Sequence, residues 1–230
     1  MMSHGRHEFD DLIEIYRKAQ GRAIAISGET EDYFATLRAR LLQIWLPEFM
    51  GHPISILDFG SSDGHMAAIV KKQFPESRVS GIDTSSRSIE YARRSHSDLE
   101  FFDFQGGRMP FQDATFDLAY AVGVLHHIPF QEHEATYHEI FRVIKPGGAF
   151  VLFEMNPWNP VTQLVFRMSA VDRHATMFSS RYASKLLRKF GLVDIRYYAY
   201  FPRLLKFLRP FEPRLEKIPF GTLYAIIVRP

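Results

Sequence analysis

Acidic residues and glycines between positions 58 and 64 carry the clearest chemical signal in the chain. The stretch lies between a short apolar run and a helical pattern and reads Asp58-Phe59-Gly60-Ser61-Ser62-Asp63-Gly64. Glycines at a strand-to-helix turn let a ligand approach the backbone and expose amide groups at a helix start. The turn therefore indicates a nucleotide-type cofactor. A tight turn without a ligand is the alternative.

The spacing in this turn excludes two common nucleotide loops. Counted from Gly60, the dinucleotide fingerprint G-x-G-x-x-G would need glycines where Ser62 and His65 stand. The phosphate loop G-x-x-x-x-G-K-[ST] is also absent. Asp83 ends the next apolar run, and a carboxylate there can accept hydrogen bonds from both hydroxyls of a ribose. The pair of turns supports an adenosine-type cofactor.

Alternating strands and helices must position these residues. Apolar runs predict strands at 54–60, 78–83, 99–103, 116–122, 149–155, 192–200 and 222–228. Helical periodicity appears at 9–20, 33–46, 63–73, 86–94, 131–144 and 179–191, with Pro146-Gly147-Gly148 expected to stop the fifth of these helices. This alternation predicts an α/β fold with a doubly wound, mostly parallel sheet and helices on both faces.

Further motifs follow the turn in a fixed order. They are Asp103-Phe104, Met109-Pro110-Phe111, Phe116-Asp117, Val124-Leu125-His126-His127 and Arg142-Val143-Ile144-Lys145-Pro146-Gly147-Gly148. With the turn, they make residues 54–155 resemble the small-molecule branch of the class I S-adenosylmethionine-dependent methyltransferases. The resemblance implies S-adenosyl-L-methionine as cofactor and a Rossmann-like, seven-stranded sheet whose last strand is antiparallel. The remaining chain resembles the family only in topology.

The resemblance also implies a domain plan and a cofactor site. We expect one domain over 1–230, with a helical lid at 1–50, a core at 54–155, and a C-terminal part at 156–230 with substrate-side inserts at 156–178 and 201–220. Tyr16 and Tyr33 are expected to close over the cofactor. The implied cofactor-binding residues are Asp58, Gly60, Ser61, Ser62, Gly64, Asp83, Thr84, Asp103, Phe104, Ala121, Val122 and Tyr33. Two features depart from the family: Ser62 replaces a glycine, and the segment with Gly106-Gly107 is lengthened.

Two adjacent histidines are candidates for acid–base chemistry. His126 and His127 follow the fourth predicted strand, where the resemblance places the transferred methyl group, and either could be a general base near neutral pH. Glu154 is a further candidate. For His126, a helix cap or a hydrogen bond to the cofactor is the favoured alternative, which leaves His127 as the preferred base. His133 and His138 lie about 140° apart around a helix, so no metal site is predicted.

Composition narrows the range of acceptors. The chain has 230 residues, 46% of them hydrophobic, which suits one domain with a sizeable core. Without any cysteine it can form neither disulfides nor the thiolate adduct that cytosine C-methylation requires. Asn156-Pro157-Trp158 resembles a motif for nucleic-acid amines but follows the fifth strand rather than the fourth, so we interpret it as a turn. No nucleic-acid partner is expected.

The charges are divided unevenly along the chain. Residues 1–156 hold 15 basic and 22 acidic residues, whereas residues 157–230 hold 13 and 4. The basic segment 201–220 favours an anionic substrate or peripheral contact with an anionic membrane, and a solvated basic face is the equal alternative. No signal peptide or bilayer-spanning run is visible in the sequence, and a cytoplasmic location is expected.

The acceptor is expected to be a small molecule. The preferred interpretation is methylation of oxygen, or nitrogen, on a sugar-containing or lipid-linked glycan. A quinone or polyketide-type aromatic acceptor is the alternative within the family. A nicotinamide-dependent oxidoreductase and a non-catalytic nucleotide-binding module are the alternatives outside it. The oligomeric state stays open.

Overall fold

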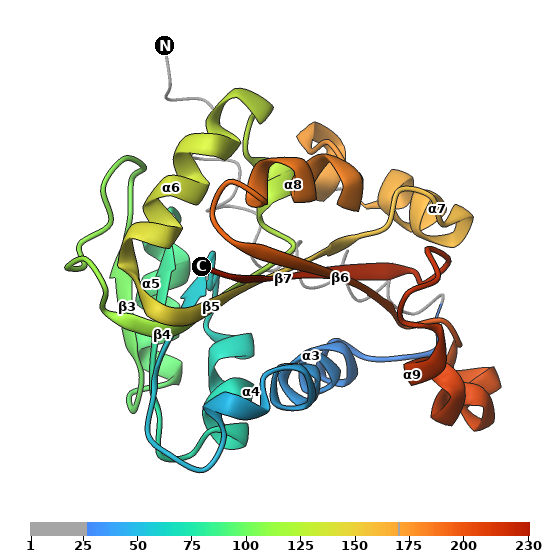
Figure 1. Ribbon diagram of the computed structural model, residues 1–230, viewed down its shortest axis with the longest axis horizontal. Coiled ribbons are helices and arrows are strands. Elements are labelled where there is room, and N and C mark those ends of the chain that lie inside the picture. The colour runs from blue at the N-terminus through green and yellow to red at the C-terminus, as the bar shows by residue number, and fades with distance from the viewer. Residues whose placement is uncertain (1–26, 170) are drawn as a thin grey trace.

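The protein is described by a computed structural model, which covers residues 27–169 and 171–230 (Figure 1). Its centre is a seven-stranded sheet in the order β3-β2-β1-β4-β5-β7-β6. The strands are β1 (Ser55–Phe59), β2 (Arg78–Asp83), β3 (Glu100–Asp103), β4 (Phe116–Val122), β5 (Ile144–Met155), β6 (Leu192–Tyr198) and β7 (Leu223–Arg229). The α-helices are α3 (Glu31–Trp45), α4 (His65–Gln73), α5 (Ser86–Ser95), α6 (His133–Val143), α7 (Pro160–Met168), α8 (Ser180–Leu187) and α9 (Glu212–Leu215).

The strand directions confirm the predicted fold. Strands β1 to β5 pair in parallel, and β7 runs antiparallel to both β5 and β6. Because parallel strands all end at the same edge, residues that follow β1 to β5 meet there. Since β7 is reversed between β5 and β6, strand β6 also ends at that edge.

Helices cover both faces of the sheet, as Figure 1 shows. Apolar residues of α3, α4 and α5 pack on one face, against Ile56, Tyr120 and Val151. Apolar residues of α6 and α8 pack on the other face, against neighbouring strand positions such as Phe150 and Leu152. Successive strand residues point to opposite faces. Burial on both sides explains why these strands read as continuous apolar runs rather than alternating ones.

The boundaries of one predicted strand were wrong. Strand β5 begins at Ile144, so the Pro146-Gly147-Gly148 stretch belongs to the strand instead of stopping the helix, which already ends at Val143. A Cβ at Gly148 would lie 2.7 Å from the Asp117 carbonyl oxygen, which explains the glycine at this close approach. The predicted helix at 9–20, together with Tyr16, lies outside the described residues.

Two insertions leave the carboxyl edge of the sheet. The first contains α7, whose N-cap Asn159 accepts hydrogen bonds from the backbone amides of Val161 and Thr162. The second joins β6 to β7 and holds a 3₁₀-helical segment, Arg203–Phe211, followed by α9. Within the described parts of the chain, no helix has both the length and the apolar character needed to cross a bilayer.

Candidate functional site

The turn after β1 is shaped by three left-handed residues, Gly60, Ser62 and Gly64. Gly60 has φ 79°, and a Cβ there would lie 2.3 Å from Cγ2 of Val124, so only glycine fits against the segment after β4. Ser62 has φ 48°. A non-glycine residue rarely adopts this conformation. The structure thus keeps the backbone shape expected of a glycine at position 62 although the residue has changed.

Asp83 fixes this turn to the end of β2. Its Oδ2 accepts a hydrogen bond from the Ser62 amide at 2.8 Å, and its Oδ1 accepts one from the Ser85 amide at 2.9 Å. Ser85 in turn is the N-cap of α5. One carboxylate therefore organises both turns between which the resemblance places the ribose.

Asp103 stands beside Asp83 at the end of the neighbouring strand. The two residues are register partners in the β2–β3 pair. Asp103 accepts hydrogen bonds from Ser86 Oγ and from Gln105 Nε2, both at 2.6 Å. Gln105 was not predicted; it lies in the lengthened segment before Pro110, where the family pattern gives no guide. Phe104 packs edge-on against Phe59, with ring centroids 6.3 Å apart.

Asp58 is the least satisfied polar group of the cofactor edge. It is 2% exposed, its side chain interacts with the hydroxyl of its cross-strand neighbour Tyr120, and neither its Oδ2 nor that hydroxyl has a further hydrogen-bond partner among the described residues. Burial raises the pKa of Asp58 to about 8. The Ser61 hydroxyl is also buried without a partner. A buried carboxyl with an unpartnered oxygen fits the amino group of an amino-acid-type ligand, so the edge has the chemistry that S-adenosylmethionine requires.

Other residues of the predicted set lie close to this edge. Ala121 and Val122 end β4, and Ala121 is fully buried. Tyr33 is on the first turn of α3, next to Asp32, whose Oδ1 lies 2.9 Å from Nε2 of His65 at the start of α4. The start of α3 is therefore held beside the cofactor turn. That Tyr33 closes over the cofactor stays a prediction.

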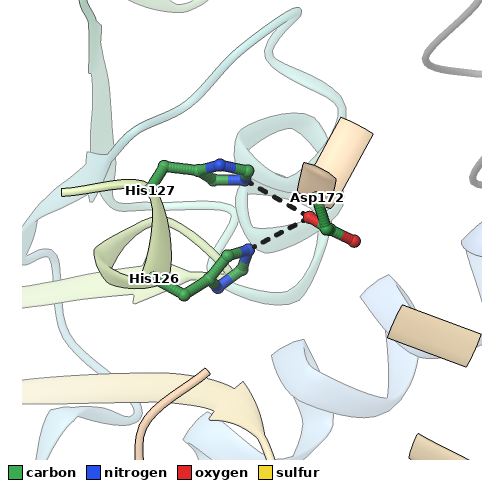
Figure 2. Close-up of side chains that lie close together, drawn as sticks. All are labelled: His126, His127 and Asp172. Carbon is green, nitrogen blue, oxygen red and sulfur yellow. Dashed lines mark ion pairs between the residues drawn. The ribbon is translucent and has the colours of Figure 1, made fainter. Parts of the chain in front are cut away.

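A cluster of histidines and carboxylates lies beyond β4 and β5 (Figure 2). His126 Nδ1 lies 2.7 Å from Glu154 Oε2, while His126 Nε2 lies 3.4 Å from Asp172 Oδ1. His127 Nε2 approaches the same Asp172 oxygen at 3.6 Å. Glu154 also accepts a hydrogen bond from the Leu125 amide at 3.0 Å. Four side chains from three segments therefore form one buried polar group.

The two histidines differ in charge. Burial opposes protonation of His126, but Glu154 and Asp172 outweigh it and raise its pKa to about 10. Burial and the neighbouring His126 charge lower the pKa of His127 to about 4. At neutral pH, His126 is an imidazolium between two carboxylates and His127 is neutral.

The two histidines also differ in access to solvent. The side chain of His127 is 20% exposed, whereas those of His126 and Glu154 are each 3% exposed. His126 neither caps a helix through its side chain nor faces the open surface; it is sealed by its two carboxylate partners. Of the three predicted catalytic residues, His127 alone reaches the surface of the site.

Ligand atoms of His126, His127 and Asp172 all lie within 4.8 Å of one another. Each ring nitrogen of His126 faces a carboxylate in this arrangement, so the group forms an ion-paired cluster. His133 is fully buried, and its Nε2 lies 2.9 Å from the Leu125 carbonyl oxygen, whereas His138 is exposed. The predicted packing role of His133 is thus what the structure shows.

Asp172 was missed by sequence reasoning. It lies in a short 3₁₀ helix, Val171–His174, within the irregular insertion after β5. No periodicity or motif there distinguishes it from a surface aspartate. Only the folding of the insertion back over the edge of the sheet, where the Thr176 amide donates to the His126 carbonyl at 2.9 Å, brings it to the histidines.

Two hollows flank this insertion. One, of about 320 Å³, is lined by residues of 126–131 together with His174 and Thr176. The other, of about 400 Å³, is lined mainly by Pro157, Phe166 and Met177, with Gln163 and Arg167 at its polar side. Thr176 lines both hollows. The hollow next to His127 therefore combines polar and apolar side chains, and the second hollow, which shares Thr176 with it, is largely apolar.

Asn156, the first residue of the Asn-Pro-Trp stretch, is held by hydrogen bonds within the fold. Its side-chain amide donates to the carbonyl oxygens of Pro219 at 3.0 Å and Gly221 at 2.8 Å, and its Oδ1 accepts from the Trp158 amide. The residue is 1% exposed. These bonds match the predicted turn.

Comparison with known proteins agrees with the geometry. A family model described as a methyltransferase domain matches residues 56–148. A demethylmenaquinone methyltransferase of Chlorobaculum parvum is 33% identical over 129 residues, which are 54% of this chain and 52% of the relative. A sterol 24-C-methyltransferase of Aspergillus fumigatus is 36% identical over 160 residues, covering 65% of this chain and 41% of the relative. The chain thus spans about half the length of these relatives.

Solved structures share the fold. A possible histamine N-methyltransferase of Thermotoga maritima superimposes with a TM-score of 0.67 at 16% identity and covers 97% of this chain and 99% of its own. An S-adenosylmethionine-dependent methyltransferase of Archaeoglobus fulgidus gives a TM-score of 0.64 at 16% identity, over 85% of this chain and 94% of its own. With the cofactor turn, the paired aspartates and the strand order, these comparisons identify a methyltransferase domain at 56–148 and support a class I S-adenosylmethionine-dependent methyltransferase.

Proposed function

We propose that the chain is a methyltransferase whose acceptor is a lipid-soluble, quinone-type aromatic molecule in its hydroquinone form. The named relatives act on menaquinone precursors and on sterols, and these names favour the aromatic alternative over the glycan acceptor that we preferred from the sequence. The largely apolar hollow at Phe166, which shares Thr176 with the hollow that His127 lines, supports the proposal in this structure.

The side chains around the hollows suit a flat, apolar ring. Phe166 packs edge-on against His126, with ring centroids 6.1 Å apart. Phe130 lines the smaller hollow and is itself in edge contact with His133 and Phe178. Aromatic acceptors gain from such edge and face contacts in addition to the burial of area. A sugar would instead need several hydrogen-bond partners, and the larger hollow offers few.

S-adenosylmethionine supplies an activated methyl group on a sulfonium when it is bound. Asp83, Asp103 and Asp58 would hold its ribose, adenine and amino group at the edge described above. The chain must then orient the acceptor and remove its hydroxyl proton. Loss of that proton raises electron density on the oxygen and on the adjacent ring carbons, and one of these atoms forms the new bond to the methyl carbon as the carbon–sulfur bond breaks.

His127 is the residue we propose as the proton acceptor. It is neutral at neutral pH, and its side chain reaches the hollow. The proton would stay on the His127 imidazole, next to the Asp172 carboxylate, until solvent removes it. His126, Glu154 and Asp172 are positioning residues in this scheme, because the ion pairs of His126 with Glu154 and Asp172 fix the charge around His127.

An assay of methyl transfer to short-chain hydroquinones tests the proposal. We expect labelled methyl groups on a demethylhydroquinone and none on glycan lipids, with a loss of about 10²–10³ in kcat for His127→Gln. His138→Gln is the matched control, since His138 is an exposed histidine on α6. Transfer to glycans alone would overturn the choice of acceptor. Cofactor binding without transfer to any small molecule would favour a non-catalytic binding module.

The proposal also includes a membrane partner for the basic segment. An acceptor of this type is stored in membranes, so the basic segment 201–220 is proposed to face an anionic lipid surface. The cytoplasmic location expected from the sequence stays a prediction.

A further inference from the structure

The outer side of α7 exposes an apolar stripe. Val161, Leu164 and Met168 are spaced by three and four residues and are 47%, 53% and 63% exposed. Residues at this spacing lie on one face of a helix. Helices on globular proteins normally turn such a stripe toward the core. Here the side of α7 that bears Gln163 and Phe166 lines the larger hollow instead.

The second insertion exposes a similar stripe. Leu204, Phe207 and Phe211 are 86%, 69% and 50% exposed. Pro202 precedes this segment and Pro210 interrupts it. Burial of large apolar side chains away from water is favourable. The exposure of several such side chains therefore indicates that this surface binds another surface.

Hydrogen bonds join the start of α7 to the end of the second insertion. The Asn159 side chain donates to the Phe220 carbonyl at 2.8 Å, and the Thr162 hydroxyl donates to the Thr222 carbonyl at 2.7 Å. Phe220 is itself 71% exposed. Figure 1 shows α7 and α9 at the same end of the molecule. We call residues 158–168 and 203–220 the apolar–basic face.

The charges on this face are mostly positive. Arg203 and Lys206 are exposed next to Leu204 and Phe207. The two acidic residues of the second insertion are turned inward: Glu212 accepts hydrogen bonds from the Tyr200 and Phe201 amides, and Glu216 accepts one from Trp45 Nε1. The outer side therefore pairs cations with apolar side chains.

We infer that the apolar–basic face docks on the surface of an anionic phospholipid bilayer. Interfacial segments combine exposed aromatic and leucine side chains with lysine and arginine, and the cations complement anionic headgroups. The face lies at the carboxyl edge of the sheet, since α7 follows β5 and the second insertion follows β6. Docking would hold the opening next to His127 against the lipid. The inference deepens the proposed function, because a lipid-soluble acceptor would enter from that side.

Co-sedimentation of the full chain with vesicles tests the inference. The probes are vesicles of phosphatidylglycerol and phosphatidylcholine in equal parts, and vesicles of phosphatidylcholine alone. We expect binding to the anionic vesicles that weakens in high salt. The double variants Leu204→Glu/Phe207→Glu and Arg203→Glu/Lys206→Glu should each bind at least about ten-fold more weakly.

Two control variants place the same changes at the opposite edge of the sheet. Leu192→Glu alters an 81% exposed leucine at the start of β6, and Lys72→Glu alters an exposed lysine near the end of α4. Both should bind vesicles as the unaltered chain does. Far-UV circular dichroism and cofactor binding check that each variant is folded.

Three results would overturn the inference. They are equal binding to both vesicle types, equal losses in the control variants, and a dimer that Leu204→Glu/Phe207→Glu dissociates while no vesicles bind. Methyl transfer to a short-chain hydroquinone in the absence of vesicles tests the proposed function separately. A chain that is active in that assay but does not bind vesicles would keep the function and lose the docking surface.

Discussion

The Ser62 amide donates a hydrogen bond to Asp83 Oδ2 at 2.8 Å, which ties the turn after β1 to the end of β2. The other oxygen of Asp83 holds the Ser85 amide. The carboxylate that is expected to bind the ribose hydroxyls therefore also sets the shape of the turn beside it. Folding itself therefore orders this carboxylate before any ligand binds.

Replacement of Asp83 by asparagine should weaken cofactor binding by about 10- to 100-fold, because an amide has one acceptor oxygen where the carboxylate has two and lacks its charge. Isothermal titration calorimetry with S-adenosylmethionine measures the change. Asp98→Asn, at an exposed aspartate before β3, is the matched control and should leave affinity unaltered. Equal affinity in Asp83→Asn would remove Asp83 from the site.

Replacement of Ser62 by glycine should stabilise the protein. A left-handed conformation costs a non-glycine residue roughly 1–2 kcal/mol, and glycine gives part of this back through its greater freedom in the unfolded chain. We expect the thermal midpoint to rise by about 2–4 °C. Ser95→Gly, at the end of α5, should lower it. A lower midpoint in Ser62→Gly would mean that the serine side chain contributes more than its backbone conformation costs.

Asp58 should exchange a proton when the cofactor binds. Because burial raises its pKa to about 8, the carboxyl is largely protonated at pH 7. The positive amino group of the cofactor favours the carboxylate, so binding should release about one proton at pH 7. Calorimetry in buffers of different ionisation enthalpy counts it. Asp58→Asn should release none, and the absence of release from the unaltered chain would contradict the assignment.

The strands and the acidic positions of the cofactor edge follow from local pattern. The first four apolar runs, of five to seven residues, each end in an aspartate or at a glycine, which predicts the strands of an α/β fold. Asp58, Asp83 and Asp103 are placed at one edge by strand direction alone, so their grouping was predictable. The early start of β5 was not predictable, because Pro146 and the glycines that follow it normally punctuate helices.

The acceptor side could not be predicted to the same depth. Asp172 reaches His126 and His127 only after an irregular insertion folds over the sheet, and no spacing rule connects positions 46 residues apart. The burial of His126 and Glu154 could not be predicted either, because it depends on the ion pair that they form with each other. Side chains that are grouped by ion pairs, as these are, come together only through tertiary packing.

Protonation of His126 should stabilise the folded chain at low and neutral pH. Its pKa is raised from 6.5 to about 10, with Glu154, Asp172 and His127 facing it. A raised pKa contributes fully below 6.5, and the contribution is lost as the pH rises through 10. Urea unfolding between pH 6 and 10 should therefore show a steeper fall for the unaltered chain than for His126→Gln. Parallel curves would contradict a charged His126.

Replacement of Asp172 by asparagine should lower kcat about 10- to 100-fold without altering cofactor affinity, since it removes the carboxylate that stabilises a proton on His127. The acidic limb of the pH–rate profile should move to lower pH, because the Asp172 charge raises the pKa of His127. A merely structural role would lower stability and leave the profile in place. Asp98→Asn serves again as control.

The reversed strand β7 has a consequence for how this protein can vary. Because β6 and β7 pair as antiparallel neighbours, the connection 199–222 leaves and re-enters the sheet at the same edge. Its exposed part, which includes Leu204 and Phe207, can change without altering any strand register, whereas Glu216, Pro219 and Gly221 are bonded to Trp45 and Asn156. Chimeras that carry a different 204–208 segment on the same core would retain the fold while altering what the molecule attaches to.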